Sequence, residues 1–166
     1  RSDTGADNSV FSSSGYGEVT HGGGPFNLPA GIAVAANGDI FVADGHSGMD
    51  TNMRIVKYSK DGTFIKEWGK KGTAPGELDG AHGLAFDSRG RLFVADRGNR
   101  RIQIFDQDGN FIDVWYQFGR PSGIYIDPND VLYSADSESG SVSPAHGDWF
   151  RGIRVGSALT GVVDYL

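Results

Sequence analysis

The sequence lacks cysteine, long apolar runs and an excess of positive charge, and each absence excludes a class of protein. Without cysteine, neither a disulfide nor a thiolate metal site can form. No apolar run approaches the roughly 18 residues of a membrane span, and no signal peptide is visible, so we expect no membrane contact. The 15 Lys and Arg residues are outnumbered by 21 Asp and Glu, which gives a net charge of −6. Because binding to a nucleic-acid backbone needs clustered positive charge, we expect no nucleic-acid partner.

Glycine is abundant instead, with 26 Gly among 166 residues, and 38% of the residues are hydrophobic. That hydrophobic fraction is enough for the core of one domain. Several of the glycines follow Asn or Asp, and such pairs form the tight turns of β-hairpins. The composition therefore favours an all-β protein.

A repeated pattern organises the chain from residue 31 to its end. In three units a glycine is followed by an aspartate at a constant offset, and an isoleucine is followed by Trp or Leu at the same offset. The first pairs are Gly31 with Asp44, Gly83 with Asp96, and Gly123 with Asp136; the second are Ile55 with Trp68, Ile102 with Trp115, and Ile153 with Leu166. The units recur with a period of roughly 40–50 residues, which is typical of propellers and other repeat arrays.

Each unit divides into four short apolar runs separated by turn signals, which predicts a four-stranded antiparallel meander. In the first unit the runs are 31–36, 40–44, 54–59 and 64–68. The first two runs are apolar on both faces, as expected for sheets packed between other sheets. Four-stranded sheets stacked around an axis make a β-propeller. We therefore predict three blades, at about 30–69, 82–117 and 122–166, preceded by an arm at 1–29 that contains a degraded repeat strand.

This topology gathers the long connections on one face of the molecule. The start of each first strand lies beside the end of the second strand, together with the variable loops 45–53 and 137–151. Variable loops on a rigid scaffold commonly carry binding and catalysis. We therefore expect the functional site on this side, called the loop face below, which bears Ala30, His82 and Ser122.

The units resemble NHL repeats. The resemblance lies in the first runs PAGIAV and AHGLAF, the second runs IFVAD and LFVAD, and the third runs RIVKY and RIQIF. It also lies in the Asp-Gly turns that precede an aromatic strand. The stretch from GGGPFNLP through VADRGNRRIQIFDQDG is similar in particular to the peptidyl-α-hydroxyglycine α-amidating lyase branch. The resemblance spans about 22–166, nearly the whole chain. It implies a six-bladed ring and a zinc ion held by three histidines near the central channel. It also implies a reaction that cleaves a C-terminal α-hydroxyglycine into a peptide amide and glyoxylate.

Position in the motifs identifies three candidate site residues. His82 in AHGLAF matches a zinc-binding histidine of the family, and Arg97 in VADRGNR matches an active-site arginine. The family's catalytic tyrosine follows an Asp-Gly pair, and here that pair is followed by His46, a candidate replacement or further ligand. Tyr16 has a similar local setting, but it lies in the degraded repeat. The other two zinc histidines of the family would fall outside this chain.

Simpler interpretations remain for each candidate. The counterparts of His82 in the other repeats are Ala30 and Ser122, so a blade does not require histidine, and His82 would equally bond to a neighbouring loop. The guanidinium of Arg97 would hold a carboxylate through two hydrogen bonds, or would pair with an acid such as Asp96 or Asp44. His46 would be an exposed loop residue.

The recurring aspartates of the three units predict a structural role, such as accepting backbone N–H groups where the second strand ends. The 136–139 run together with Asp148 holds oxygen ligands of the kind that calcium prefers, and a hydrated loop is the simpler interpretation. His21 and His146 lie in glycine-rich loops without a partner at ligand spacing.

Three blades do not close a propeller, which takes about four or more. We expect that two chains join into a six-bladed ring with two-fold symmetry. A longer parent protein, or an arm that covers one edge, would also protect the open blade faces. In the two-chain ring the copies of His82 would lie on opposite sides of the channel, which does not reproduce three histidines on alternate blades.

Together these features favour a protein related to the zinc-dependent amidating lyases, with His82 as a metal ligand and with Arg97 and His46 as catalytic candidates. The alternative is a non-catalytic scaffold that binds a peptide or protein on its loop face.

Overall fold

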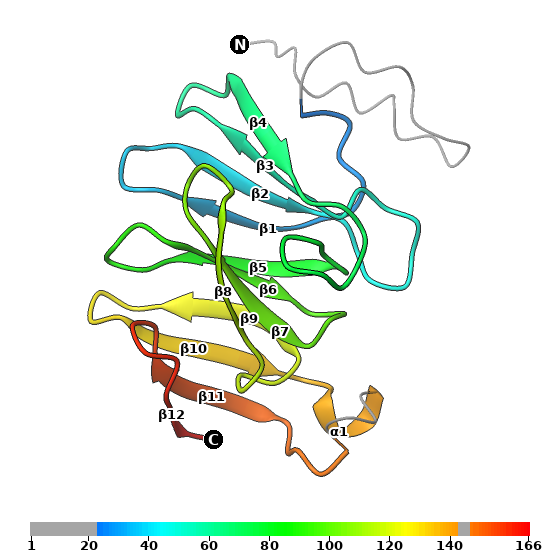
Figure 1. Cartoon of the computed structure of the whole chain (residues 1–166), viewed down its shortest axis with the longest axis vertical. Helices are drawn as coiled ribbons and strands as arrows, with labels where there is room; N and C mark the ends of the chain where they lie inside the picture. Colours follow the sequence, from blue (N-terminus) through cyan, green and yellow to red (C-terminus); the bar gives the residue numbers. More distant parts are fainter. Residues whose placement is uncertain (1–22, 143–146) are drawn as a thin grey trace.

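The computed structural model describes residues 23–142 and 147–166 as three four-stranded antiparallel sheets stacked in a row (Figure 1). Blade 1 comprises β1 (Pro29–Val34), β2 (Ile40–Asp44), β3 (Arg54–Tyr58) and β4 (Phe64–Trp68). Blade 2 comprises β5 (Ala81–Phe86), β6 (Leu92–Asp96), β7 (Arg101–Phe105) and β8 (Phe111–Trp115). Blade 3 comprises β9 (Pro121–Ile126), β10 (Val131–Asp136), β11 (Gly152–Ser157) and β12 (Val163–Tyr165), with a short helix α1 (Ser139–Val142) after β10.

The predicted meander is confirmed, because each blade pairs its strands in chain order. The first strand of blade 1 begins slightly earlier than predicted. Its pairing begins where Pro29 faces Asp44, and Ala35 already belongs to the turn, accepting a 2.8 Å hydrogen bond from the N–H of Gly38. At the tip of this hairpin Gly38 has φ 92°, a conformation that suits glycine.

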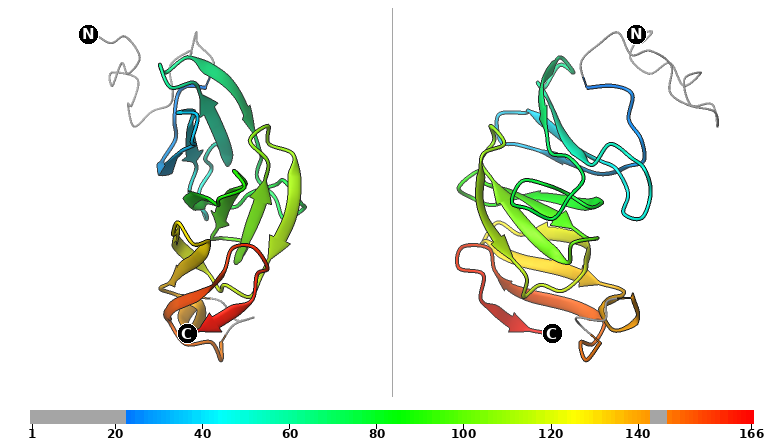
Figure 2. Two further views of the ribbon diagram at one scale, coloured as in Figure 1. Left: turned by 90° about the vertical axis from the view of Figure 1, so that its left-hand side faces the viewer. Right: turned by 45° about the vertical axis from the view of Figure 1, so that its right-hand side comes forward.

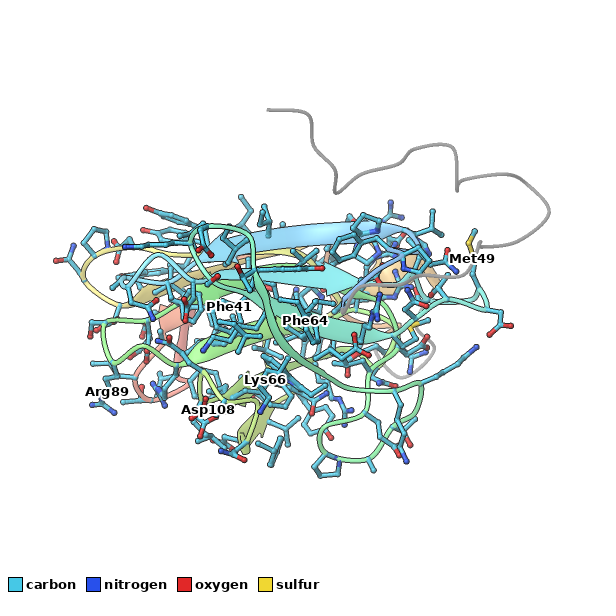
Figure 3. The ribbon with its side chains drawn as sticks, turned by 90° about the horizontal axis from the view of Figure 1, so that it is seen from above. Phe41, Met49, Phe64, Lys66, Arg89 and Asp108 are labelled. Atoms are coloured by element: carbon cyan, nitrogen blue, oxygen red, sulfur yellow. The ribbon has the colours of Figure 1, made fainter. Side chains whose placement is uncertain are left out.

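Long and short connections lie at opposite ends of the strands. In Figure 3, Met49 of the 45–53 loop and Arg89 of the β5–β6 hairpin lie at opposite ends of the molecule. In Figure 1 the 45–53 loop and α1 lie on the right and the tight hairpins on the left. The variable connections therefore share one face, as the topology predicts.

Two apolar cores lie between the blades. Phe41 and Ile55 of blade 1 pack with Leu92 and Phe105 of blade 2, and all four side chains are fully buried. A second core joins the opposite side of blade 2 to blade 3, with Phe93 among its buried members. Blade 2 is therefore covered on both sides, and every residue of β6 and β7 is buried.

A column of glycines sets the spacing of the first strands, which run along one side of the stack in Figure 2. A Cβ atom on Gly31 would lie 3.3 Å from the Cα of Gly83, and one on Gly83 would lie 3.3 Å from the Cα of Gly123. These distances are tighter than ordinary carbon contacts, so a side chain here would push the blades apart. At Gly123 a Cβ would meet no atom within 4 Å.

The recurring aspartate forms the same clip in each blade. Asp96 is fully buried and accepts hydrogen bonds from the Arg101 Nε at 2.7 Å, the Gln103 Nε2 at 3.0 Å and the backbone N–H of Asp79 at 2.7 Å. Arg54 pairs with Asp44 at 3.0 Å and Arg154 pairs with Asp136 at 2.5 Å in the same way. Removing one partner of such a buried pair leaves an uncompensated charge and costs about 3–5 kcal/mol. The structural role predicted for these aspartates is therefore confirmed.

Blade 3 presents an apolar face that no described residue covers. Tyr125, Tyr133, Val155 and Tyr165 form one cross-strand row on it, with the rings of Tyr125 and Tyr133 6.0 Å apart. Side chains at alternate positions of a strand share a face, so Ile153 belongs to the same surface and is 58% exposed. We call these five residues the front face of blade 3. At the other end of the stack, Ile32 and Val34 of β1 are also exposed.

Some predictions concern residues outside the described ranges: the degraded strand of the N-terminal arm, Tyr16, His21 and His146. Among residues 23–142 and 147–166, no helix is long and apolar enough to cross a membrane.

Candidate functional site

A β-bulge at the start of each blade sets one residue out of register on the loop face. In blade 2, Ala81 pairs with Asp96 and Gly83 pairs with Ala95, so His82 is the extra residue between them. Blades 1 and 3 repeat the irregularity around Ala30 and Ser122. Because bulges redirect a side chain at the end of a strand, the three positions present one variable group from each blade.

The residue that follows the second strand lies next to this bulge. In blade 3 the two positions are Ser122 and Ser137, and their hydroxyl oxygens are 2.8 Å apart. The corresponding residues of blade 2 are His82 and Arg97, and the positive charge of Arg97 acts on His82. The same scaffold position therefore holds two hydroxyls in one blade and an imidazole with a guanidinium in another.

His46 reaches His82 from the neighbouring blade, with ring centroids 4.8 Å apart and ring planes at 65°. The Nδ1 of His46 lies 2.9 Å from the carbonyl oxygen of Ser47, a distance at which a protonated Nδ1 donates a hydrogen bond to that oxygen. The Nε2 of His82 is buried and has no hydrogen-bond partner among the described residues. The two histidine rings thus lie beside each other, and the loop bond proposed as the simpler role of His82 is not made through its Nε2.

The environment of His82 favours the neutral imidazole. Burial, together with the positive charge of Arg97 and the neighbouring His46 and Arg120, lowers the pKa of His82 to about 4. At neutral pH the ring therefore carries no charge. Neutral imidazole is the form that binds metals and accepts protons.

Arg97 forms an ion pair with an acid, as its simpler interpretation proposed, but the acid is Glu138. Its Nη2 pairs with Oε2 of Glu138, and Nη1 of Arg120 pairs with the same oxygen. The acids suggested as its partners, Asp96 and Asp44, are bound by the clip arginines instead. The two named partners were wrong because the buried clips already occupy both carboxylates.

Arg120 and Glu138 are the site residues that sequence reasoning missed. Arg120 precedes the first strand of blade 3 where the other blades have Leu28 and Gly80, and Glu138 corresponds to His46 and Gly98. Both depart from their repeat counterparts, as His82 does. That departure is the signal that would have found them.

The described residues do not fit a complete zinc site. His46 and His82 offer two imidazole nitrogens, and the described part of the chain holds no group of three or more His, Cys, Asp or Glu that could surround a metal. A catalytic zinc ion needs three protein ligands. For the predicted calcium site, the oxygens of Asp136 already accept bonds from Arg154 and from the N–H groups of Glu138 and Ser139, so they are not free to bind a cation.

An apolar hollow lies apart from this cluster, on blade 3. It has a volume of about 230 Å³ and is lined by Asp148, Trp149, Phe150, Arg154 and Leu166. The Arg154 guanidinium lies 4.6 Å from the centre of the Trp149 ring and also holds Asp136. Since none of the candidate site residues lines it, we do not assign the chemistry of the loop face to this hollow.

Comparison with known proteins identifies the repeats. The NHL repeat model matches residues 26–58 and 78–105, which cover the first three strands of blades 1 and 2. The chain is 37% identical over 114 residues to human NHL repeat-containing protein 3, covering 68% of this chain and 31% of that protein. It is also 37% identical over 123 residues to peptidyl-glycine alpha-amidating monooxygenase A of Xenopus laevis, covering 68% of this chain and 13% of the relative.

A third relative is peptidyl-alpha-hydroxyglycine alpha-amidating lyase 1 of Drosophila melanogaster, 37% identical over 99 residues, which are 54% of this chain and 18% of the lyase. The chain thus spans about a third or less of the length of these relatives. Among solved structures, the RRP9 WD40 repeats superimpose with a TM-score of 0.64 at 17% identity, over 85% of this chain and 38% of that one. This last similarity concerns the blade architecture alone.

Proposed function

Because the chain is an NHL-repeat protein with propeller-type blades, we propose that its loop face binds a peptide ligand and anchors the ligand's carboxylate on Arg97. The observation that carries this proposal is the convergence of His46, His82 and Arg97 from two blades onto one side of the scaffold. None of the three is required by the repeat, since their counterparts in the other blades differ.

The chemistry of the three side chains suits a peptide terminus. A guanidinium donates two parallel hydrogen bonds to a carboxylate. The rings of His46 and His82 add flat surface beside it, and the neutral ring of His82 adds an acceptor. Net charge elsewhere on the molecule is negative, so an anionic ligand is directed to this positively charged part of the surface.

Direct binding measurements test this function. A short peptide with a free C-terminal glycine, and the same peptide as its amide, are titrated into the protein by calorimetry. We expect Arg97→Ala to weaken binding of the acid about tenfold or more, because a hydrogen bond to a charged group is lost, and to leave the amide unchanged. Arg89→Ala, on the opposite hairpin face, is the control. Equal binding of acid and amide to the unmodified protein would contradict the proposal.

A second candidate function is the lyase reaction itself, which the similarity to the amidating lyases favours. In that reaction the C–N bond of the α-hydroxyglycine breaks, the hydroxyl loses its proton as the aldehyde of glyoxylate forms, and the nitrogen gains a proton to give the amide. The zinc of that family would supply Lewis-acid chemistry when bound. Because the described residues supply two histidines, further ligands would have to come from outside them.

Metal content and turnover separate the two functions. Elemental analysis of the purified protein and glyoxylate release from a peptidyl-α-hydroxyglycine are measured for the unmodified protein and for His82→Ala. A lyase predicts bound zinc and turnover that are both lost in the variant. A binding scaffold predicts peptide binding without glyoxylate release.

A further inference from the structure

The ion pairs of Glu138 join two arginines that come from different blades. Arg97 follows β6 in blade 2, whereas Arg120 precedes β9 in blade 3, and both guanidinium groups contact the Oε2 of Glu138. The arginine side chains are 12% and 13% exposed, and that of Glu138 is 31% exposed. Two largely buried cations therefore share one carboxylate that is more open to water.

The charges of this triad do not balance. Two guanidinium groups carry one positive charge more than Glu138 neutralises. Burial lowers the pKa of Arg97 and of Arg120, and for Arg120 the positive charge of Arg97 contributes as well. Nearby, Asp79 and Arg100 add one charge of each sign, and the carboxylate of Asp136 is held in its clip. The site thus retains a net positive charge in a partly desolvated setting, which favours a further anion.

A buried donor at this site lacks an acceptor. The Nε of Arg97 is buried and has no hydrogen-bond partner among the residues described, whereas Nη2 donates to Glu138. A carboxylate that approached the guanidinium side-on would accept from Nε and Nη2 together. An unsatisfied buried donor costs free energy. A ligand that accepts a hydrogen bond from this Nε would remove that cost and would bind more tightly as a result.

Hydrogen bonds hold the backbone of all three residues of the triad. The backbone N–H of Arg97 donates to the carbonyl of Gly80, and that of Arg120 donates to Asp136 Oδ2 and Ser139 Oγ. The backbone N–H of Glu138 is also fixed, donating to Asp136 Oδ1. Because both arginines contact the same oxygen of Glu138, a rotation of that side chain would release both of them.

We propose that Arg97 and Arg120 together form a carboxylate-binding site, and that Glu138 is its internal occupant, which the carboxylate of a ligand displaces. This inference rests on the proposed function and deepens it, because it adds Arg120 as a second anchor and makes Glu138 a competitor of the ligand. The alternative is a permanent bridge between blades 2 and 3.

The test uses hippurate, a small acylglycine, and hippuramide, its uncharged amide, as probes of the full chain in calorimetric titrations. We expect Glu138→Gln to bind hippurate about tenfold more tightly than the unmodified protein, since the internal carboxylate no longer competes, and to bind hippuramide no better. In Glu138→Gln combined with Arg120→Gln the gain disappears.

Glu67→Gln is the matched control, because Glu67 pairs with Arg54 at the edge of blade 1 and makes the same kind of contact. It leaves hippurate binding unchanged. A thermal unfolding curve of each variant accompanies the titration, and Glu138→Asp, which keeps the charge on a shorter side chain, gives an intermediate affinity.

The possible results separate these alternatives. Unchanged or weaker hippurate binding in Glu138→Gln, including no binding to either protein, overturns the inference and favours the permanent bridge, which predicts only a lower melting temperature. A gain in hippurate affinity without glyoxylate release from any variant leaves the carboxylate site in place and removes the lyase function. A gain that Arg120→Gln does not reverse excludes Arg120 as the second anchor.

Discussion

At the scale of single residues, His82 is the side chain whose charge state the fold controls most clearly. Its folded-state pKa of about 4 lies below the ordinary value of 6.5. Between these two values the unfolded chain binds more protons than the folded chain, so the free energy of unfolding rises with pH. The contribution is complete above pH 6.5 and is lost as the pH falls toward 4.

We therefore predict that replacing His82 by serine, the residue of blade 3 at this position, flattens the acid limb of the stability profile. Urea unfolding at several pH values between 4 and 7 measures the free energy for both proteins. The unmodified protein loses more stability than His82→Ser over this interval. An NMR titration that gave His82 a pKa near 6.5 would contradict the prediction.

Single site residues could be predicted from the sequence, but the contacts between them could not. His82 and Arg97 could be found because each stands at a fixed offset inside a repeated motif. Glu138 also has a fixed repeat position, but its contact with Arg97 could not be predicted, because it lies in a loop of variable length and meets Arg97 across 41 positions of sequence. A repeat pattern specifies where strands begin and end, but it does not specify which loop side chains from adjacent blades approach one another.

At the scale of elements, the constant spacing between residues of the repeat predicted the strands correctly. The constant offset between glycine and aspartate corresponds to one hairpin, in which Gly83 lies beside the strand that ends at Asp96. Loops contribute nothing to this register, so their lengths vary freely while the blades stay alike. The all-β blades and the loop face were therefore predictable, and the bulge that holds His82 out of register was not.

The first strands offer a matched pair of glycines for a test of packing. A Cβ on Gly83 would lie 3.1 Å from the backbone nitrogen of Ile124, whereas a Cβ on Gly123 would meet no atom within 4 Å. We predict that Gly83→Ala lowers the free energy of unfolding by about 1–3 kcal/mol through overpacking. Gly123→Ala changes it by no more than about 1 kcal/mol, since only the unfolded chain is affected. Denaturant unfolding of both variants measures this, and equal losses would show that the column does not set the blade spacing.

At the scale of the whole molecule, the exposed blade faces bear on self-association. Ala33 and Phe86 belong to the core between blades 1 and 2, and Ala85 and Ile126 belong to the core between blades 2 and 3. On the front face of blade 3 the alanine position holds Tyr125 instead. The opposing position on blade 1 is Val34, which is smaller than its counterparts Phe86 and Ile126. The large side chain of Tyr125 would therefore pack against the smaller Val34 of a second copy.

We accordingly retain the expectation that two copies join through these faces, and native mass spectrometry tests it. The unmodified protein is expected to appear as two chains, and Tyr125→Asp as one, because a charge would be buried at the contact. Tyr116→Asp, at a tyrosine that is 53% exposed outside the front face, leaves the mass of two chains unchanged. A single chain for the unmodified protein at micromolar concentration would rule the two-chain ring out.

The glycine column has a consequence for the way such a protein can change in the course of evolution. The strands β1 and β5 each touch the backbone of the next first strand, so a substitution at Gly31 or Gly83 is felt by two blades and is poorly tolerated. The segments from the clip aspartate to the third strand are under fewer such constraints, and their lengths already differ among the three units. Duplication of a blade therefore copies a rigid frame together with a loop that is free to diverge. New specificity in this architecture arises by insertion between fixed strands, while the ancestral frame remains recognisable in the spacing of its glycines.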